Sequence, residues 1–581
     1  MSFTTRPVIM GTHGVISTGH YLASAAGLRV LHNGGNAVDA GVTAAFCLAV
    51  LEPHQYSIGG EAIMLFYSAE QEKVISISGH GIAPKNMTID WFKEHEIDPI
   101  PGNGMLPATV PSAVDGLITT LKKFGTKTLA DTLAPAVELA EKGFPMYDEL
   151  RKKLVKNYEK FAQEWPSSID AFFSQAELPN VGELFIQLLW ANTFKLLLEA
   201  EKANSGKGRE AALEAARDIF YKGEIAEKIV DFAQNFKCKD SSGKVNSGFL
   251  TKEDLADFHI KIEEPLTFNY RGYDVYKCGP WCQGPVFLQQ LALLEGFDLK
   301  AMGHNSADYI HTVAEAAKLA FADREAYYGD WDFDEVPLNI LLSKDYAAKR
   351  RKLIDPKTAS ADFKAGDVGR GELPYEICSA VHEKPEEQSG DTTHLDVIDA
   401  DGNMFSATTS GGWLMDSPAV KGLGFPLGTR CQMFYLDSRR PNALEPGKRP
   451  RTTLTPSLTL KDGKPFMAFG TPGGDMQDQW TLQFFINVID FGMNLQEAAD
   501  AASFHIEHFP CSFDPRQMLI KRLNVERRVG TEVIEELKAR GHDVVVDDDW
   551  THGKVLGITI ENKIIKGCAS PKNEIGYAIG W

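Results

Sequence analysis

Residues 389–403, Ser-Gly-Asp-Thr-Thr-His-Leu-Asp-Val-Ile-Asp-Ala-Asp-Gly-Asn, change character abruptly at Thr392. A polar, turn-prone run ends there, an alternating strand-like segment follows, and an Asp-Gly-Asn turn signal closes it. Thr392 is therefore predicted to open a buried strand. If the chain is cut before Thr392, this residue gains a nucleophilic hydroxyl and an α-amine that can serve as its base, because an α-amino group titrates near pH ~7.7–8.0. Local sequence alone favours the simpler interpretation, a strand start or helix cap whose hydroxyl bonds the backbone.

The segment before Thr392, residues 355–391, is rich in Lys, Asp, Glu, Gly and Pro and has little apolar periodicity. Such a segment buries little surface, so we expect a mobile surface loop. Its position suits a site of cleavage. An ordinary linker between two halves of the chain explains the composition equally well.

The composition of the 581-residue chain is that of a soluble globular protein, with 43% hydrophobic and 24% charged residues. The net charge of −19 and the lack of Lys/Arg clusters argue against nucleic-acid binding. The first 18 residues do not resemble a secretory signal, and the apolar run over residues 40–51 is too short to span a membrane. We therefore expect a cytoplasmic protein with no membrane partner, and reduced thiols at its eight cysteines.

Helical and strand-like patterns interleave without a regular period, which favours an α+β architecture. Residues 36–51 form an apolar helix that Asn36 is expected to cap. Residues 112–234 are mostly helical. After Thr392 the pattern turns to strands, with a hairpin signal at Asp462-Gly463.

Four further groups carry candidate chemistry. Gly473 and Gly474 follow an apolar strand and can expose backbone N–H groups toward an oxyanion, or can simply form a tight turn. The stretch over residues 448–453, with three cations and two hydroxyls, could bind a carboxylate or be a solvated loop. Arg430 is another cation between apolar runs. Cys278 and Cys282 have no histidines at metal-ligand spacing nearby, so a zinc site is not expected.

Taken together, the motifs closely resemble those of the γ-glutamyltransferase (γ-glutamyltranspeptidase) family of N-terminal nucleophile hydrolases. They occur in the same order along nearly the whole chain, which is far more specific than any one of them. The matching segments are Asn33–Ala40, Ser57–Gly60, Tyr270–Tyr273, Asp391–His394, Pro446–Pro450 and Pro472–Gly474.

The resemblance implies a four-layer αββα sandwich and a precursor that cuts itself between Asp391 and Thr392. The products would be a large subunit, residues 1–391, and a small subunit, residues 392–581, that form one intertwined catalytic domain. Thr392 would be the nucleophile in both self-cleavage and turnover, Ser410 its supporting hydroxyl, and Gly473 and Gly474 the oxyanion hole. No metal or organic cofactor is implied, and whether two processed heterodimers associate stays open.

Departures from the family pattern fall in the pocket for the acyl group. Ile89 stands where the family has its carboxylate-binding arginine. The family's amine-binding acidic residue is absent from the block Gly428–Met433, where Arg430 would repel an ammonium. Thr452 and Thr453 replace a pair of serines. This pattern resembles a subgroup that includes oxamate amidohydrolase, and cephalosporin acylase-like relatives form another branch.

Three hypotheses result. The first is a self-processing amidohydrolase that attacks a small carboxylate-bearing amide, with Arg430, Thr452 and Thr453 binding the acyl group. The second is a true γ-glutamyl hydrolase or transferase, acting on glutathione-like substrates through a rearranged pocket. The third is an unprocessed relative that has lost catalysis.

Overall fold

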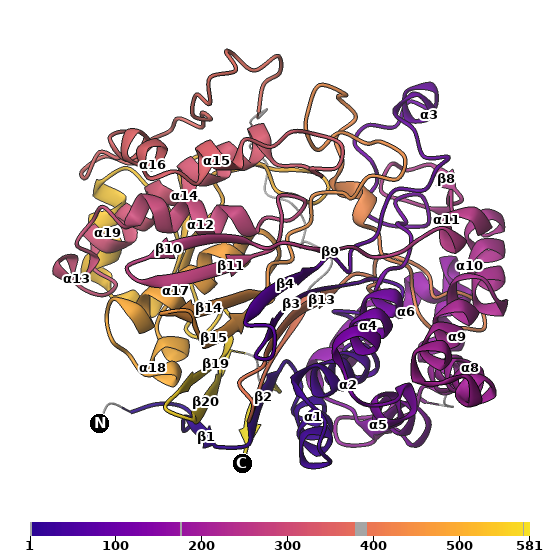
Figure 1. The fold of residues 1–581 in the computed structure, drawn as a ribbon. Helices are drawn as coiled ribbons and strands as arrows, with labels where there is room; N and C mark the ends of the chain where they lie inside the picture. Colours follow the sequence, from indigo (N-terminus) through magenta and orange to yellow (C-terminus); the bar gives the residue numbers. More distant parts are fainter. Residues whose placement is uncertain (1–2, 175–176, 378–391, 573–574) are drawn as a thin grey trace.

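The computed structural model describes residues 3–174, 177–377, 392–572 and 575–581 (Figure 1). Within these ranges two seven-stranded sheets dominate. One is named after the strand that opens with Thr392, and the other after the strand that ends just before Gly473 and Gly474. The β12 sheet has the order β21 (Tyr577–Gly580), β2 (Gly14–Thr18), β12 (Thr392–Asp399), β13 (Met404–Ser410), β3 (Glu61–Ser68), β4 (Lys73–Ile77), β9 (Ile262–Glu263). The β15 sheet has the order β1 (Ile9–Gly11), β20 (Ile564–Ala569), β19 (Leu556–Glu561), β15 (Lys464–Gly470), β14 (Ser457–Lys461), β11 (Tyr273–Lys277), β10 (Leu266–Tyr270).

The two sheets pack face to face. Side chains of both contribute to one buried apolar cluster, with Ile398 and Met404 from the β12 sheet and Leu458 and Ile558 from the β15 sheet. Because side chains alternate along a strand, Thr392, His394 and Asp396 share the face of β12 that carries Ile398. The layer between the sheets is therefore apolar at one end and polar at the end where Thr392 lies.

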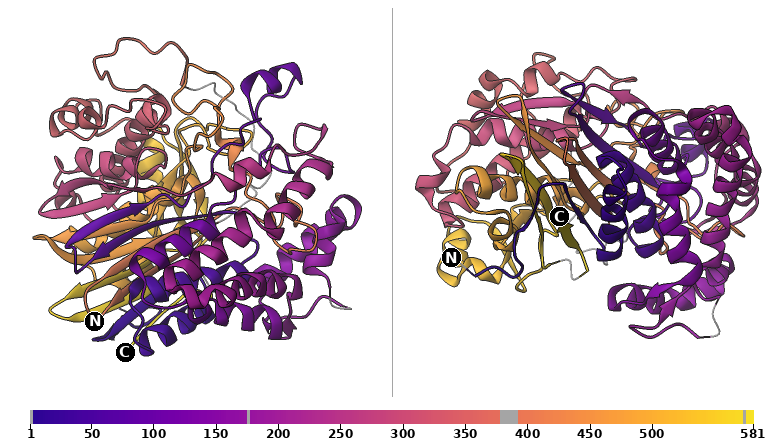
Figure 2. Two further views of the ribbon diagram at one scale, coloured as in Figure 1. Left: turned by 45° about the vertical axis from the view of Figure 1, so that its right-hand side comes forward. Right: turned by 60° about the horizontal axis from the view of Figure 1, so that its bottom comes forward.

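Helices cover the outer faces of both sheets, as the views in Figures 1 and 2 show. On the β12 sheet they are α1 (Tyr21–His32), α2 (Ala37–Leu51), α4 (Ala113–Phe124) and α5 (Leu129–Lys142). On the β15 sheet they are α12 (Gly284–Leu294), α14 (Ala307–Tyr327), α17 (Gln477–Ile489) and α18 (Leu495–Asp500). The predicted four-layer αββα sandwich is confirmed.

Local sequence patterns determine the ends of several of these helices and strands, as predicted. Asn36 caps α2 through a reciprocal bond with Asp39, and every residue of α2 is buried. Asp462, with a φ of 51°, and Gly463, with a φ of 73°, make the turn between β14 and β15. Local turn and cap chemistry thus sets the element ends.

The remaining elements lie around this sandwich, mostly as an outer helical region beside α5 (right side of Figure 1). The longer ones are α3 (Ile89–Glu94), α6 (Asp148–Glu164), α7 (Pro166–Phe172), α8 (Leu188–Asn204), α9 (Arg209–Tyr221), α10 (Glu224–Asn235), α11 (Lys252–Ala256), α16 (Lys344–Arg351), α19 (Thr531–Ala539), β16 (Phe504–Ile506), β17 (Arg522–Glu526) and β18 (Asp543–Asp547).

Both sheets combine strands from before and after Thr392. β12 lies between β2, from the first part of the chain, and β13, from the second, and β14 pairs with β11 in the same mixed way. Neither part could keep its sheets without the other.

Residues 355–377, the described part of the segment predicted to be mobile, contain no helix or strand. They nevertheless contact the body of the protein: the Gly366 N–H donates to Asp323 at 2.8 Å, and the Tyr375 hydroxyl donates to the Ala326 carbonyl at 2.7 Å. Residues 378–391 lie outside the described residues, so mobility there and cleavage after Asp391 stay predictions.

Candidate active site

Thr392 is the first residue of β12 and lies directly opposite Ser410, the last residue of β13. Their hydroxyl oxygens are 3.2 Å apart, and both side chains are buried. The antiparallel register thus brings the predicted nucleophile and its predicted supporting hydroxyl into hydrogen-bond contact.

Arg430 lies in the 3₁₀ turn Arg430–Met433 and reaches the same hydroxyl pair. Its Nη2 donates to Ser410 Oγ at 2.7 Å, and its guanidinium group stacks on the rings of Trp413, at 4.8 Å, and Phe513, at 5.7 Å. The side chain is fully buried, and Nη1 has no hydrogen-bond partner among the described residues. The Ser410 hydroxyl therefore lies between Arg430 and the predicted nucleophile, Thr392, and contacts both.

Glu61 is a member of this site that the sequence analysis missed. It opens β3, lies opposite Ser410, and accepts a charge-assisted hydrogen bond from Arg430 Nε. Burial raises the pKa of the Glu61 carboxyl and the contact with Arg430 opposes that rise. Its Oε2 is buried and has no partner among the described residues.

The partnership changes the electrostatics expected around Arg430, because the charges of Glu61 and Arg430 oppose each other at close range. The signal was present in the sequence: an acidic residue follows Gly59-Gly60 at the start of a strand whose residues are all buried. Charged residues are rarely buried without a partner, so such a position requires one.

The predicted oxyanion residues lie in a turn with unusual backbone angles. Gly473 and Gly474 have φ values of 125° and 53°. A Cβ on Gly473 would lie 2.2 Å from the ring of Trp480, so only glycine fits there. Phe513, which stacks on Arg430, also lies beside Gly474 and so connects this turn to the nucleophile end of the site.

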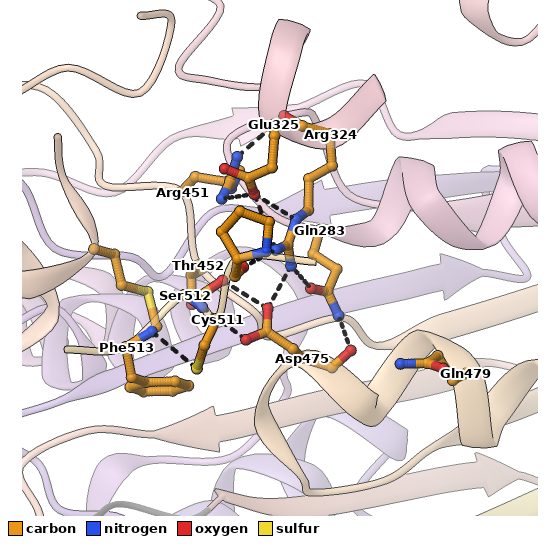
Figure 3. A network of polar contacts seen from close by, with 12 residues as sticks. Gln283, Arg324, Glu325, Arg451, Thr452, Asp475, Gln479, Cys511, Ser512 and Phe513 are labelled. Carbon is orange, nitrogen blue, oxygen red and sulfur yellow. Dashed lines mark hydrogen bonds and ion pairs between the residues drawn. The ribbon is translucent and has the colours of Figure 1, made fainter. Parts of the chain in front are cut away.

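A buried polar network holds the residue after this turn (Figure 3). The Asp475 carboxylate forms an ion pair with Arg324 and accepts the Ser512 N–H at 2.8 Å and the Ser512 hydroxyl at 2.6 Å. Gln283 closes the ring by accepting from Arg324 at 2.6 Å and donating to the Asp475 carbonyl at 3.1 Å. By holding Asp475, the network fixes the conformation of the turn at Gly473 and Gly474.

The two threonines predicted to bind substrate differ in their surroundings. Thr452 makes backbone hydrogen bonds to Trp281 and Gln283, and its hydroxyl accepts the Leu454 N–H at a long 3.4 Å. Thr453 Oγ1 is buried and has no hydrogen-bond partner among the described residues. Of the two hydroxyls, that of Thr453 is the one left for a ligand.

The basic stretch before these threonines is neither solvated nor open to a ligand. Lys448 forms an ion pair with Asp334 at 2.6 Å, Arg449 one with Asp330 at 2.6 Å, and Arg451 one with Glu325 at 2.6 Å. All three cations are buried. The three cations are therefore part of neither a solvated loop nor an open carboxylate site, the two alternatives considered from the sequence. They form structural ion pairs instead.

One cluster of potential metal ligands occurs in the described part of the chain: His311, Glu315 and His542. The two imidazoles hydrogen-bond each other at 2.8 Å, and Lys318 forms an ion pair with Glu315 at 2.6 Å. The other nitrogen of His311 bonds the Asp355 carbonyl at 2.7 Å, and His542 Nδ1 has no hydrogen-bond partner among the described residues. Cys278 and Cys282 are both buried free thiols.

The family model described as "Gamma-glutamyltranspeptidase" matches residues 23–580. The chain belongs to the γ-glutamyltranspeptidase family. It is 33% identical over 583 residues to the "Glutathione hydrolase-like YwrD proenzyme" of Bacillus subtilis (strain 168), an alignment that covers 98% of this chain and 99% of the relative.

Two solved structures are similar in fold to this member of the γ-glutamyltranspeptidase family. One, described as "LmbA2991HD", has a TM-score of 0.95 at 43% identity, with 100% of both chains covered. The other, the cephalosporin acylase from Bacillus halodurans, has a TM-score of 0.82 at 30% identity, covering 100% of this chain and 98% of that one.

As a γ-glutamyltranspeptidase-family member of the N-terminal nucleophile type, the protein is a self-processing amidohydrolase. Among the described residues, no helix combines the length and apolar character needed to cross a membrane.

Proposed function

We propose that Thr392 is the nucleophile of this amidohydrolase and that the substrate is a small amide whose acyl group carries a carboxylate. The observation that carries the proposal is the buried contact between the Thr392 and Ser410 hydroxyls at the polar end of the layer between the sheets. A hydroxyl held there by a second hydroxyl is oriented for attack and shielded from bulk water.

The same hydroxyl serves self-processing. Thr392 Oγ1 attacks the Asp391 carbonyl carbon, the peptide C–N bond breaks, and an ester forms on Oγ1. Water hydrolyses the ester and leaves Thr392 with an α-amine. That amine then takes the proton from Oγ1 in each turnover.

In turnover, Oγ1 attacks the substrate amide carbon and the N–H groups of Gly473 and Gly474 stabilise the oxyanion. The protonated α-amine returns its proton to the leaving amine, and the acyl group remains as an ester on Thr392. Water cleaves the ester and releases the acid. The proposal assigns recognition of the acyl carboxylate to Arg430 Nη1 and Thr453 Oγ1, which are both buried and have no hydrogen-bond partner among the described residues.

The test is a denaturing gel combined with a panel of amide substrates. Wild type is expected to give two bands of about 43 and 21 kDa, scaled from the lengths of the two parts. Thr392→Ala removes the hydroxyl and should give one uncut band and no hydrolysis. Thr393→Ala, at the adjacent position, is the matched control and should still be cut. A processed wild type that hydrolyses none of the amides would overturn the proposal, and an uncut wild type would favour a non-catalytic relative.

A further inference from the structure

The layer between the sheets contains a buried titratable pair, His394 and Asp396, that the proposed mechanism does not use. Because side chains alternate along a strand, both share the face of β12 that carries Thr392. His394 Nε2 lies 3.1 Å from Asp396 Oδ2, and both side chains are fully buried. Burial raises the pKa of the Asp396 carboxyl, and the contact with His394 opposes that rise. Such a pair is costly to bury, so its place beside the nucleophile indicates a role.

The imidazole ring of His394 is held at both of its nitrogens. Thr408 of β13 lies directly opposite His394 in the register, and its hydroxyl oxygen is 2.9 Å from Nδ1. The Asp396 carboxylate beside Nε2 favours a proton on that nitrogen. A hydroxyl both donates and accepts, so Thr408 can pair with Nδ1 in either protonation state of the ring. The two contacts together fix the orientation of the ring.

The ring of His394 also lies against the other sheet, at Gly470, the last residue of β15. A Cβ on Gly470 would lie 2.2 Å from Cε1 and 2.4 Å from Nε2 of the ring. The backbone itself does not require glycine, because the φ of Gly470 lies outside the left-handed region. The absent side chain is therefore what allows the ring to approach β15. The proposed oxyanion turn, Gly473 and Gly474, follows Gly470 after only two residues.

The ring of His394 thus connects the strand that opens with the nucleophile to the strand that leads into the oxyanion turn. Thr392 and β15 belong to different sheets, so the hydrogen bonds within a sheet do not fix their separation. An attacking hydroxyl and an oxyanion hole act on the same carbonyl group, and a displacement of about 1 Å can cost a factor of about 100 in rate. A rigid spacer between the two strands is therefore of direct value for the reaction.

We propose that His394 is a positioning residue whose ring, seated on Gly470, sets the distance between Thr392 and the oxyanion turn. Thr408 and Asp396 keep the ring in the orientation that fits between the strands. The same spacer supports self-cleavage and turnover, because both use the Thr392 hydroxyl. This inference rests on the proposed function, because it assigns a supporting group to that nucleophile and that turn.

Thr408 offers a matched pair of variants that leave the ring itself in place. Thr408→Val removes the hydroxyl and keeps the shape of the side chain, whereas Thr408→Ser keeps the hydroxyl. With γ-glutamyl and glutaryl p-nitroanilide as substrates, Thr408→Val should lower kcat about five- to tenfold, the effect of one lost hydrogen bond, with KM changed less than about twofold. Self-cleavage should slow in the same variant. Thr408→Ser should restore most of both rates.

Thr409→Val is the control for this pair. The Thr409 side chain points to the opposite face of β13, and its buried hydroxyl has no hydrogen-bond partner among the described residues. The same substitution one position along should therefore leave kcat, KM and self-cleavage unchanged.

Gly470→Ala tests the other side of the spacer. The added methyl group meets the His394 ring and displaces the end of β15, while every polar group stays in place. We expect kcat to fall about 100-fold in the cut enzyme, with little change in KM. Cleavage is followed on a denaturing gel, so that kcat refers to cut enzyme alone, and thermal unfolding separates stability from rate. If Gly470→Ala does not fold, the Thr408 variants decide.

The outcomes separate the two proposals. If processed wild type hydrolyses neither anilide, the proposed function is overturned, and the rates of self-cleavage in Thr408→Val and Thr408→Ser then decide on His394. Wild-type kcat and self-cleavage in Thr408→Val would overturn the role of His394 alone, as would equal losses in Thr408→Val and Thr409→Val. A lower Tm in Thr408→Val with unchanged kcat would also overturn it, because the contact would then support only the fold.

Discussion

At the scale of single residues, the site is a chain of direct contacts from Glu61 through Arg430 and Ser410 to Thr392. A guanidinium group has no acceptor, so Ser410 Oγ must accept from Arg430. That interaction fixes the oxygen of Ser410 and leaves its hydrogen for another partner. The buried ion pair thus fixes the position of Ser410, and Ser410 in turn positions the predicted nucleophile, Thr392.

Ser410→Ala removes the hydroxyl that contacts both Arg430 and Thr392. We expect kcat to fall about 10- to 100-fold, the equivalent of losing a hydrogen bond to a charged group. Self-cleavage, followed as the appearance of the two bands on a denaturing gel, should also slow, because the same hydroxyl is proposed to support self-processing. Ser410→Thr keeps the hydroxyl and should retain most of the activity. Loss of activity in both variants, with unchanged thermal stability, would argue against a role for the hydroxyl.

At the scale of elements, the turn after β15 owes its conformation to groups on other segments. Asp475 is held by Arg324 of α14, by Ser512 of the loop before β17, and by Gln283 at the start of α12. Elements far apart in the sequence therefore converge beneath Gly473 and Gly474. An oxyanion hole made of backbone N–H groups depends on such support, because the glycines have no side chains to hold them.

Asp475→Asn removes one of the two carboxylates that pair with the buried Arg324 and leaves Glu325 as the other. We expect a loss of about 1.5–3 kcal/mol in the free energy of unfolding, measured by denaturant titration, the worth of a hydrogen bond to a charged group. We also expect kcat to fall more than KM changes, because in the proposed mechanism the turn stabilises the oxyanion and not the bound ground state.

Ser512→Ala is the matched control, since it removes one bond to Asp475 and leaves the ion pair. It should cost only about 1 kcal/mol. Equal losses in the two variants would contradict a special role of the ion pair.

At the scale of the whole molecule, buried ion pairs join segments from both sides of Thr392. Glu325, on α14, contacts both Arg324 and Arg451. Burial raises the pKa of its carboxyl, but the two guanidinium groups more than offset that effect and lower the pKa to about 2. The ionised form is thus strongly favoured in the folded protein.

The lowered pKa of Glu325 predicts acid sensitivity. Its ordinary pKa is 4.5, so the stabilisation is complete above that pH and is lost as the pH falls toward 2. The difference in pKa corresponds to about 3 kcal/mol at neutral pH. Urea titrations of wild type and Glu325→Gln at pH 7, 5 and 3.5 should show the stability gap narrowing as the pH falls. A gap that does not change with pH would exclude this linkage.

Much of the fold could be predicted from the amino-acid sequence. The apolar helix after Asn36, the hairpin at Asp462-Gly463 and the strand that opens at Thr392 all depend on periodicity and local turn chemistry, which act over a few residues. Ordered motifs along the chain also led to the family, and the family model confirms it.

The partners of the buried cations could not be predicted in that way. Arg430 was identified from its neighbours in sequence, yet its charge is cancelled by Glu61, 369 positions earlier. Lys448, Arg449 and Arg451 looked like an open basic stretch and are each neutralised by acidic residues more than 60 positions away. Reaction chemistry follows from residue types at recognisable spacings, whereas the electrostatics of a pocket depends on which distant strands and helices meet there. For this protein, the sequence alone therefore predicted the sandwich and the threonine nucleophile, and the tertiary structure was needed to reveal the buried charge pair that contacts Ser410.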